Sequence, residues 1–157
     1  TLHCSSAASD VYKRQHLVHM PSHIYWRIGR YDDAARVNIM AAEVDEAYIA
    51  ACNAQGFYPA AYYPHNIHFL WAAASMAGQS ELAIESGEKV ASFVRLEDID
   101  QFPTVELFHT VPLLTRVQFG HWDYLLDTPQ PRADLGFSNA IWRYARGIAL
   151  ALSLIHI

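Results

Sequence analysis

Five histidines form two short clusters whose spacing could place imidazole rings on one face of a helix. His16, His19 and His23 form the first cluster, and His65 and His68 form the second. Residues three or four positions apart lie on the same side of an α-helix. Neutral imidazole donates or accepts hydrogen bonds and is the commonest side-chain ligand for metal ions. The two clusters therefore indicate either metal binding or polar recognition.

Residues for covalent or acid–base catalysis are poorly represented around these histidines. Ser22 is the nearest hydroxyl residue, but it directly precedes His23. Neighbouring residues on a helix point about 100° apart, so these two cannot form a nucleophile–base pair. The sequence also contains no glycine-rich phosphate loop, no nucleophile elbow and no HExxH or CxxC pattern. The pattern favours binding over catalysis, and we name no catalytic residue.

The elements that carry the histidines are predicted to be helices. Apolar residues recur every three or four positions from Ala34 to Tyr48 and from Leu70 to Ala77, and no segment alternates with a period of two. A long helix is expected over about Asp32–Asn53. Helices are expected to end at three glycines, Gly29, Gly78 and Gly120. The sequence therefore predicts an all-α fold.

The three glycines share a context that resembles the helix–turn–helix unit of tetratricopeptide repeats (TPRs). Each glycine is followed five positions later by a small or apolar residue, namely Ala34, Ala83 and Leu125. The resemblance implies an α-solenoid of antiparallel helix pairs, with about three units and the start of a fourth at about Ala140. The glycines are spaced 49 and 42 residues apart, which exceeds the standard repeat of about 34 residues.

The resemblance also implies that the histidines share one groove, because their positions in the repeat line the concave face of such a solenoid. The first interpretation is a binding scaffold without a cofactor, in which the groove holds a peptide or protein segment, or a small polar ligand. Its candidate ligand-binding residues are His16, His19, His23, Tyr25, His65, Asn66, His68, Tyr144 and Arg146.

Two alternatives to the scaffold interpretation remain open. The first is a metal-binding domain of the zinc type, in which the histidines could also support a metal-dependent reaction. Its candidate ligands are His19, His23, His65 and His68. In the second, the histidines are buried structural residues that connect helices. His109 is expected to pack inward, away from the groove.

Three further segments have expected roles. Pro21 and Pro112 each lie eight residues before a turn glycine, which predicts a matched bend, unless each proline simply opens its helix. The segment Gln55–Pro64 is expected to be an aromatic loop containing Phe57, Tyr58, Tyr62 and Tyr63. The acidic stretch Glu97–Asp100 is expected to be a solvated loop.

Composition excludes several classes of protein. The chain has 157 residues, a net charge of -5 and 52% hydrophobic residues, which is too apolar for a disordered chain. The acidic balance argues against nucleic-acid binding by phosphate neutralisation. No apolar run approaches the roughly 18 residues of a membrane span. Two cysteines cannot form a disulfide framework, and Cys52 is expected to pack among alanines. These features predict a soluble protein, cytoplasmic or periplasmic if bacterial.

The two ends of the chain resemble translated sequencing adapters. The segment from Asp10 to Gln15 resembles the translation of a transposon adapter, and the segment from Leu152 to Ile157 resembles the translation of its opposite strand. We therefore expect residues 1–15 and 152–157 to be non-native, and residues 16–151 to be a TPR-like domain truncated at both ends.

Overall fold

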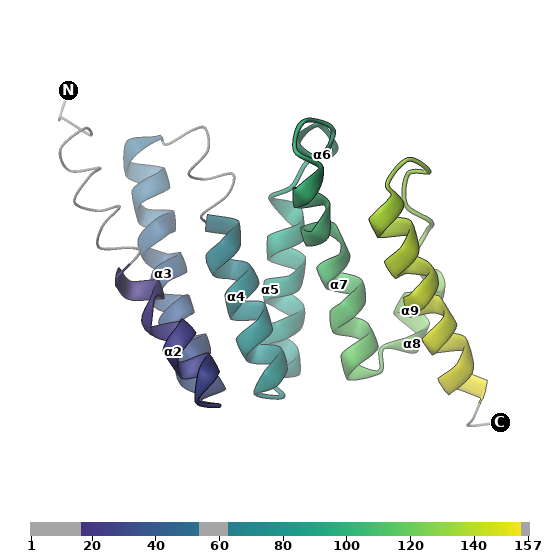
Figure 1. The fold of residues 1–157 in the computed structure, drawn as a ribbon, viewed down its shortest axis with the longest axis horizontal. Helices are drawn as coiled ribbons and strands as arrows, with labels where there is room; N and C mark the ends of the chain where they lie inside the picture. Colours follow the sequence, from purple (N-terminus) through teal and green to yellow (C-terminus); the bar gives the residue numbers. More distant parts are fainter. Residues whose placement is uncertain (1–16, 54–62, 155–157) are drawn as a thin grey trace. The chain divides into compact units, whose positions relative to one another are not determined.

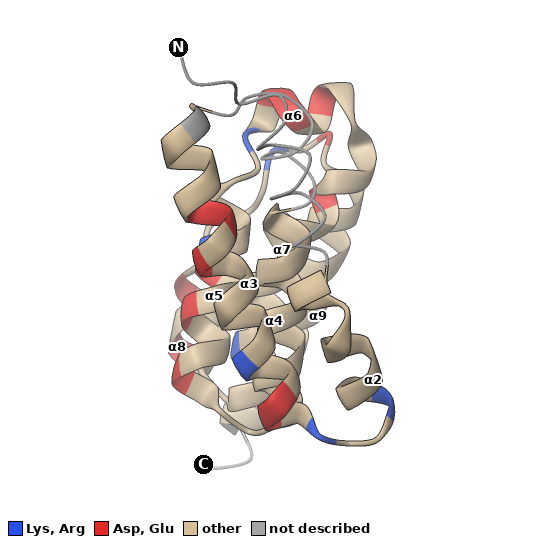
Figure 2. Ribbon diagram, turned by 90° about the vertical axis from the view of Figure 1, so that its left-hand side faces the viewer, with Lys and Arg blue, Asp and Glu red and all other residues tan. Residues whose placement is uncertain are grey.

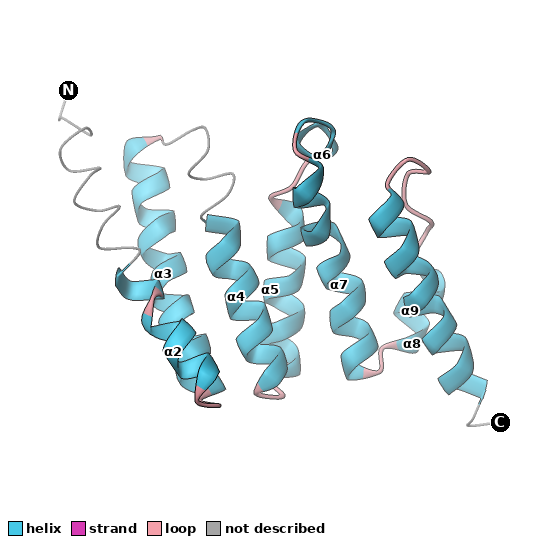
Figure 3. Ribbon diagram, viewed as in Figure 1, coloured by secondary structure: helices cyan, strands magenta, loops and turns pink. Residues whose placement is uncertain are grey.

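The computed structural model describes residues 17–53 and 63–154. Throughout this part of the chain the regular elements are helices, and none of the described residues forms a strand (Figure 3). The prediction of an all-α fold is therefore confirmed. The chain divides into two compact units, with the boundary between Gln79 and Ser80.

The first unit contains the helices α2 (Pro21–Arg27), α3 (Tyr31–Cys52) and α4 (Tyr63–Met76) (Figure 1). The long helix α3 packs against both α2 and α4. Its buried face carries small residues such as Ala34 and Ala41, which allow close approach of neighbouring helices. Ile67 and Leu70 supply the larger buried side chains from α4. The observed bounds of α3 agree with the predicted helix to within one residue at each end.

The described residues of the second unit form six helical elements of different lengths. They are α5 (Ser80–Ser92), α6 (Leu96–Gln101), the 3-10 helix η2 (Pro103–Val105), α7 (Glu106–Phe119), α8 (Trp122–Asp127) and α9 (Gly136–Leu154). Helix α7 packs against α5, α8 and α9. One core joins Leu113, Leu125, Ala145 and Ala149, with Trp122 and Trp142 packed against it. A smaller core joins Val94, Ile99 and Leu135.

The same hydrogen-bonded turn occurs at all three glycines. Gly29, Gly78 and Gly120 have φ angles of 75°, 74° and 74°, in the left-handed region that favours glycine. The residue after each glycine donates its backbone N–H to a carbonyl five positions back, over 2.9 Å each time. This is the long bond of the Schellman motif, which satisfies the last carbonyls of a helix. The glycines therefore end helices as predicted.

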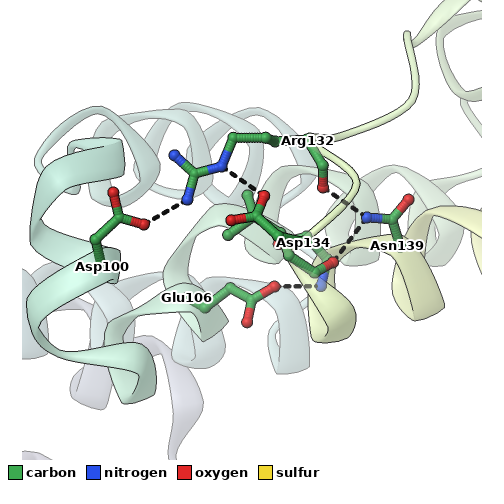
Figure 4. Close-up of polar contacts among 7 residues, drawn as sticks. Asp100, Glu106, Arg132, Asp134 and Asn139 are labelled. Atoms are coloured by element: carbon green, nitrogen blue, oxygen red, sulfur yellow. Dashed lines mark hydrogen bonds and ion pairs between the residues drawn. The ribbon is translucent and has the colours of Figure 1, made fainter.

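Helix α9 begins at Gly136, before the predicted start at about Ala140, because polar contacts fix its first turn (Figure 4). Glu106 accepts a hydrogen bond from the backbone N–H of Ser138 over 2.8 Å, which satisfies a free donor at the N-terminus of the helix. Asn139 donates to the carbonyl of Arg132, and the Arg132 guanidinium forms ion pairs with Asp100 and Asp134.

Three local expectations are corrected by the structure. Tyr63 and Pro64 are buried residues of α4, not part of a loop, and the Tyr63 hydroxyl donates to Glu46 over 2.6 Å. The acidic stretch 97–100 lies in α6, where the Asp98 carboxylate accepts a hydrogen bond from the backbone N–H of Arg95 over 3.0 Å. The two prolines do not have matched roles, since Pro112 lies inside α7 whereas Pro21 is the first residue of α2.

Several expectations concern residues outside the described part of the chain. These are His16, the loop aromatics Phe57, Tyr58 and Tyr62, and residues 1–15 and 155–157. Residues 152–154 continue α9. Among the helices that the structure describes, none is both long and apolar enough to cross a membrane. Acidic residues outnumber basic ones on α3 and on α5 (Figure 2).

The turn at Gly120 provides a test of its left-handed backbone. Gly120→Ala should lower the free energy of unfolding by about 1–2 kcal/mol, because an L-residue is strained at this φ angle. Its Cβ would also contact the Trp122 ring at 3.4 Å. The matched change Gly147→Ala, within α9 and with no atom within 4 Å of the new Cβ, should raise that free energy by about 0.5–1 kcal/mol. Urea denaturation followed by circular dichroism measures both, and equal effects would contradict the assignment.

Candidate metal centre

Three imidazole rings meet in the first unit. The Nε2 atom of His19 lies 2.9 Å from Nε2 of His23 and 3.2 Å from Nε2 of His65. One nitrogen from each of the three rings lies within 4.8 Å of the others, close enough to share a metal ion. His19 precedes α2, His23 lies in α2, and His65 lies in the first turn of α4. The predicted convergence of histidines from the two clusters is therefore observed for these three residues.

Helix α3 positions the two segments that carry the rings. It packs against both α2 and α4, which brings His65 to a residue 46 positions earlier in the sequence. The spacing of four residues then places His23 one helical turn from His19. Exposure increases across the cluster, since His19 is buried, His23 is half-buried and His65 is exposed.

Asn38 of α3 fixes the proton on the innermost ring. The Asn38 Nδ2 group donates to the backbone carbonyl of Ala34 over 2.7 Å. A carbonyl only accepts, so this bond orients the amide, and the Asn38 Oδ1 atom faces Nδ1 of His19 at 2.7 Å. Because Oδ1 is also an acceptor, Nδ1 of His19 carries the hydrogen. The lone pair of neutral His19 is therefore on Nε2 and points into the cluster.

The central nitrogen of the cluster has a single lone pair for two neighbouring nitrogens. Neutral His19 offers one lone pair on Nε2, and both His23 and His65 place a nitrogen near it. One lone pair makes one good in-plane hydrogen bond, so protons alone satisfy this arrangement poorly. A metal ion accepts a lone pair from each ring. Zn–N bonds of about 2.0–2.1 Å in a tetrahedron separate the nitrogens by about 3.3 Å, close to the two observed distances.

Aromatic side chains lie beside the cluster. The Phe69 ring packs edge-on against His19 and His23, with ring centroids 5.3 and 4.6 Å apart. The ring centroid of Trp26 lies 5.6 Å from that of Phe69, and the Trp26 ring in turn contacts the ring of Tyr31. Phe69 and Trp26 are both half-buried. The site thus combines three nitrogen ligands with an apolar side.

His68, which we predicted as a fourth ligand, lies outside the cluster. Its ring stacks on Trp71, with centroids 5.0 Å apart and planes 20° apart. Burial, aided by the charge of nearby His65, lowers the pKa of His68 to about 4. Residues three apart on a helix differ in direction by about 60°, which is enough here for His65 to face α2 while His68 packs against its own helix.

The other residues predicted to line the groove have internal partners. Asn66 is buried and donates to the carboxylate of Asp45 in α3 over 2.8 Å. The Tyr25 ring lies under the guanidinium of Arg30, at 4.7 Å. These contacts lie within the first unit, and the one between Asn66 and Asp45 is buried.

Tyr144 and Arg146 belong to the second unit. Arg146 donates to the carbonyls of Leu125 and Leu126 at the end of α8, and its guanidinium lies over the ring of Trp142. Arg146 therefore satisfies carbonyls at the end of a helix. Tyr144 is exposed on α9.

Sequence reasoning missed Asn38 and Phe69 and correctly separated His109 from the cluster. His109 is half-buried and its Nε2 group lies 2.5 Å from the carbonyl of Val94. The sequence did point to Asn38, because this polar residue lies on an apolar stripe of the helix, four positions after Ala34 and four before Ala42. A buried amide in such a stripe requires a partner, and that partner is His19.

The lowered pKa of His68 predicts a pH-dependent loss of stability. The unfolded chain binds a proton at this position below about pH 6.5, whereas the folded chain does so only below about pH 4. The free energy of unfolding should therefore be highest above pH 6.5 and should decrease as the pH drops toward 4. The decrease should be about 1–2 kcal/mol after allowance for partial solvent exposure. Denaturation of metal-free protein should show a shallower pH dependence for His68→Gln than for the parent. The matched change His121→Gln, at an exposed position, should retain the parent slope.

An unchanged slope in His68→Gln would contradict this assignment, and an altered slope in His121→Gln would show that the effect is not specific to the buried ring.

Comparison with known proteins gives no relative from which a function could be transferred. No family model matches the chain, and no curated protein or solved structure matches it. The functional argument therefore follows from the geometry of the histidine cluster and of the helices that position it.

Proposed function

We propose that this chain is a TPR-like helical scaffold whose first unit binds a zinc-type metal ion through His19, His23 and His65. The observation that carries the proposal is the convergence of three Nε2 atoms, with contacts of 2.9 and 3.2 Å to the central one. Support comes from Asn38, which holds the His19 ring in the tautomer that a metal bound at Nε2 requires.

The repeat character of the scaffold is supported by its turns. The three glycines have nearly identical φ angles and the same hydrogen bond across the helix end. Each turn is followed at once by another helix, α3, α5 or α8. We infer a solenoid of antiparallel helix pairs, in which a recurring turn leads from the first to the second helix of each pair.

Two observations favour metal binding over the interpretation of purely structural histidines. A structural histidine needs one partner for each nitrogen, whereas here nitrogens of three rings gather within 4.8 Å of one another. The third ring is also exposed, so burial does not force His65 into this arrangement. An ion that accepts three lone pairs accounts for both features.

The contacts of the remaining residues favour this proposal over a wide polar groove. Asn66 donates a hydrogen bond to Asp45, and Arg146 donates to the carbonyls of α8. A peptide or small polar ligand held by the whole predicted set would have to displace these bonds. A metal bound by the three histidines requires no such displacement, so the metal proposal demands fewer changes to the structure.

Binding of Co²⁺, a spectroscopic probe for zinc sites, tests the proposal directly. The purified full chain should bind one Co²⁺ and acquire the visible absorption of a low-symmetry site, and one Zn²⁺ should displace it. His65→Ala, a change at an exposed position, should weaken binding by more than about 100-fold through loss of a ligand. His23→Ala should have a similar effect.

The matched control is His121→Ala, an exposed histidine in the second unit, which should leave Co²⁺ affinity unchanged. Circular dichroism establishes that each variant is folded. Folded His65→Ala protein with the affinity of the parent would refute the proposed ligand set.

The role of Asn38 in orienting a ligand gives a separate expectation. Asn38→Ala should weaken Co²⁺ binding about 10–100-fold while the cobalt spectrum keeps its three-nitrogen character, because the orienting partner is lost and the ligands remain. Asn38→Asp should restore only part of the affinity, since a carboxylate accepts from Nδ1 of His19 but cannot donate to the carbonyl of Ala34. Equal affinities for parent and Asn38→Ala would show that Asn38 does not position the ligand.

A further inference from the structure

We infer that the metal held by His19, His23 and His65 keeps an exchangeable fourth position, which binds a small carboxylate against the aromatic side formed by Phe69 and Trp26. This inference rests on the proposed function, because it concerns the same ion. It adds the class of ligand that the site takes.

The three ligands found among the described residues leave one position of a tetrahedral ion open. Among the residues that the structure describes, the group that could hold a metal contains three histidines and neither a cysteine nor a carboxylate. His68, which we predicted as a fourth ligand, stacks its ring on Trp71 instead. Zinc sites that serve a structural role have four protein ligands, whereas three protein ligands leave a place for water or an external group.

Charge makes an anion the suited occupant of this position. Three neutral imidazoles leave a divalent ion with its full double charge. Helix α4 contains no charged residue, and α2 contains only Arg27. Asp45 is the buried carboxylate of the neighbouring α3, and it accepts a hydrogen bond from Asn66 rather than joining the histidines. The helices that supply the ligands therefore provide no negative charge of their own to the ion.

The surroundings of the rings specify a carboxylate with an apolar substituent. His65 is exposed and His23 is half-buried, so solvent reaches the edge of the cluster. Phe69 has its ring within 6.3 Å of all three histidine rings by centroid distance, and Trp26 extends the same apolar side. A carboxylate oxygen can bind the ion while a flat apolar group lies against these half-buried rings.

Titration of the Co²⁺-loaded full chain with acetate and benzoate tests the inference. Both anions should change the cobalt absorption with a single binding site, and benzoate should bind roughly tenfold more tightly because its ring contacts the aromatic side. Perchlorate, which coordinates metals poorly, should leave the spectrum unchanged at the same ionic strength. Trp26→Leu should reduce the preference for benzoate at least about threefold, while acetate affinity changes little.

The matched variant is Trp71→Leu, which removes the tryptophan stacked on His68 outside the cluster and should retain the parent preference. If Co²⁺ binds but neither carboxylate alters its spectrum, the fourth position is closed and the inference is wrong, while the proposed metal site stands. If acetate and benzoate bind equally, the assigned aromatic contact is wrong. If Co²⁺ itself does not bind, the proposed function fails first.

Discussion

The candidate site depends on one hydrogen bond, from Nδ1 of His19 to Oδ1 of Asn38. A histidine ring has two nitrogens, and the partner of one determines the chemistry of the other. Asn38 is itself oriented by the carbonyl of Ala34, one turn earlier in α3. A backbone carbonyl of α3 therefore determines, through two successive bonds, that His19 presents a lone pair to His23 and His65. Without that constraint the same three rings could exchange protons among several equivalent arrangements.

A metal at this point would also connect parts of the chain that are distant in sequence. His19 and His23 lie at the beginning of the described chain, and His65 follows the long helix α3. Helix α2 has only seven residues and exposes Ile24, so its own burial supplies little stability. An ion bound by α2 and α4 together would favour the folded first unit in proportion to its concentration and affinity. In the proposed scaffold, metal binding and the docking of α2 are therefore linked equilibria.

The sequence was sufficient to predict α3 and the three helix ends at glycine, because these follow from local physics, but it missed α6 and the first turns of α4 and α9. Gly29, Gly78 and Gly120 adopt a backbone conformation that other residues avoid, and apolar spacing alone predicts α3. The partner of each polar side chain was harder to predict. His65 and His68 have the same residue type and share a helix, yet one joins the cluster and the other stacks on Trp71. Arg146 similarly satisfies carbonyls of α8, a need that arises only when α8 and α9 are packed together.

The buried polar pairs of α3 explain why the imidazoles converge with such short contacts. Asn38 pairs with His19, just before α2, and Asp45 pairs with Asn66 of α4. Unlike apolar contacts, which tolerate sliding, each of these pairs would leave a buried polar group without a partner if its helix shifted by a fraction of a turn. The two pairs therefore fix α2 and α4 in register against the same helix, about two turns apart along it. Because Asn66 directly follows His65, the bond that fixes α4 also fixes the position from which His65 reaches the cluster.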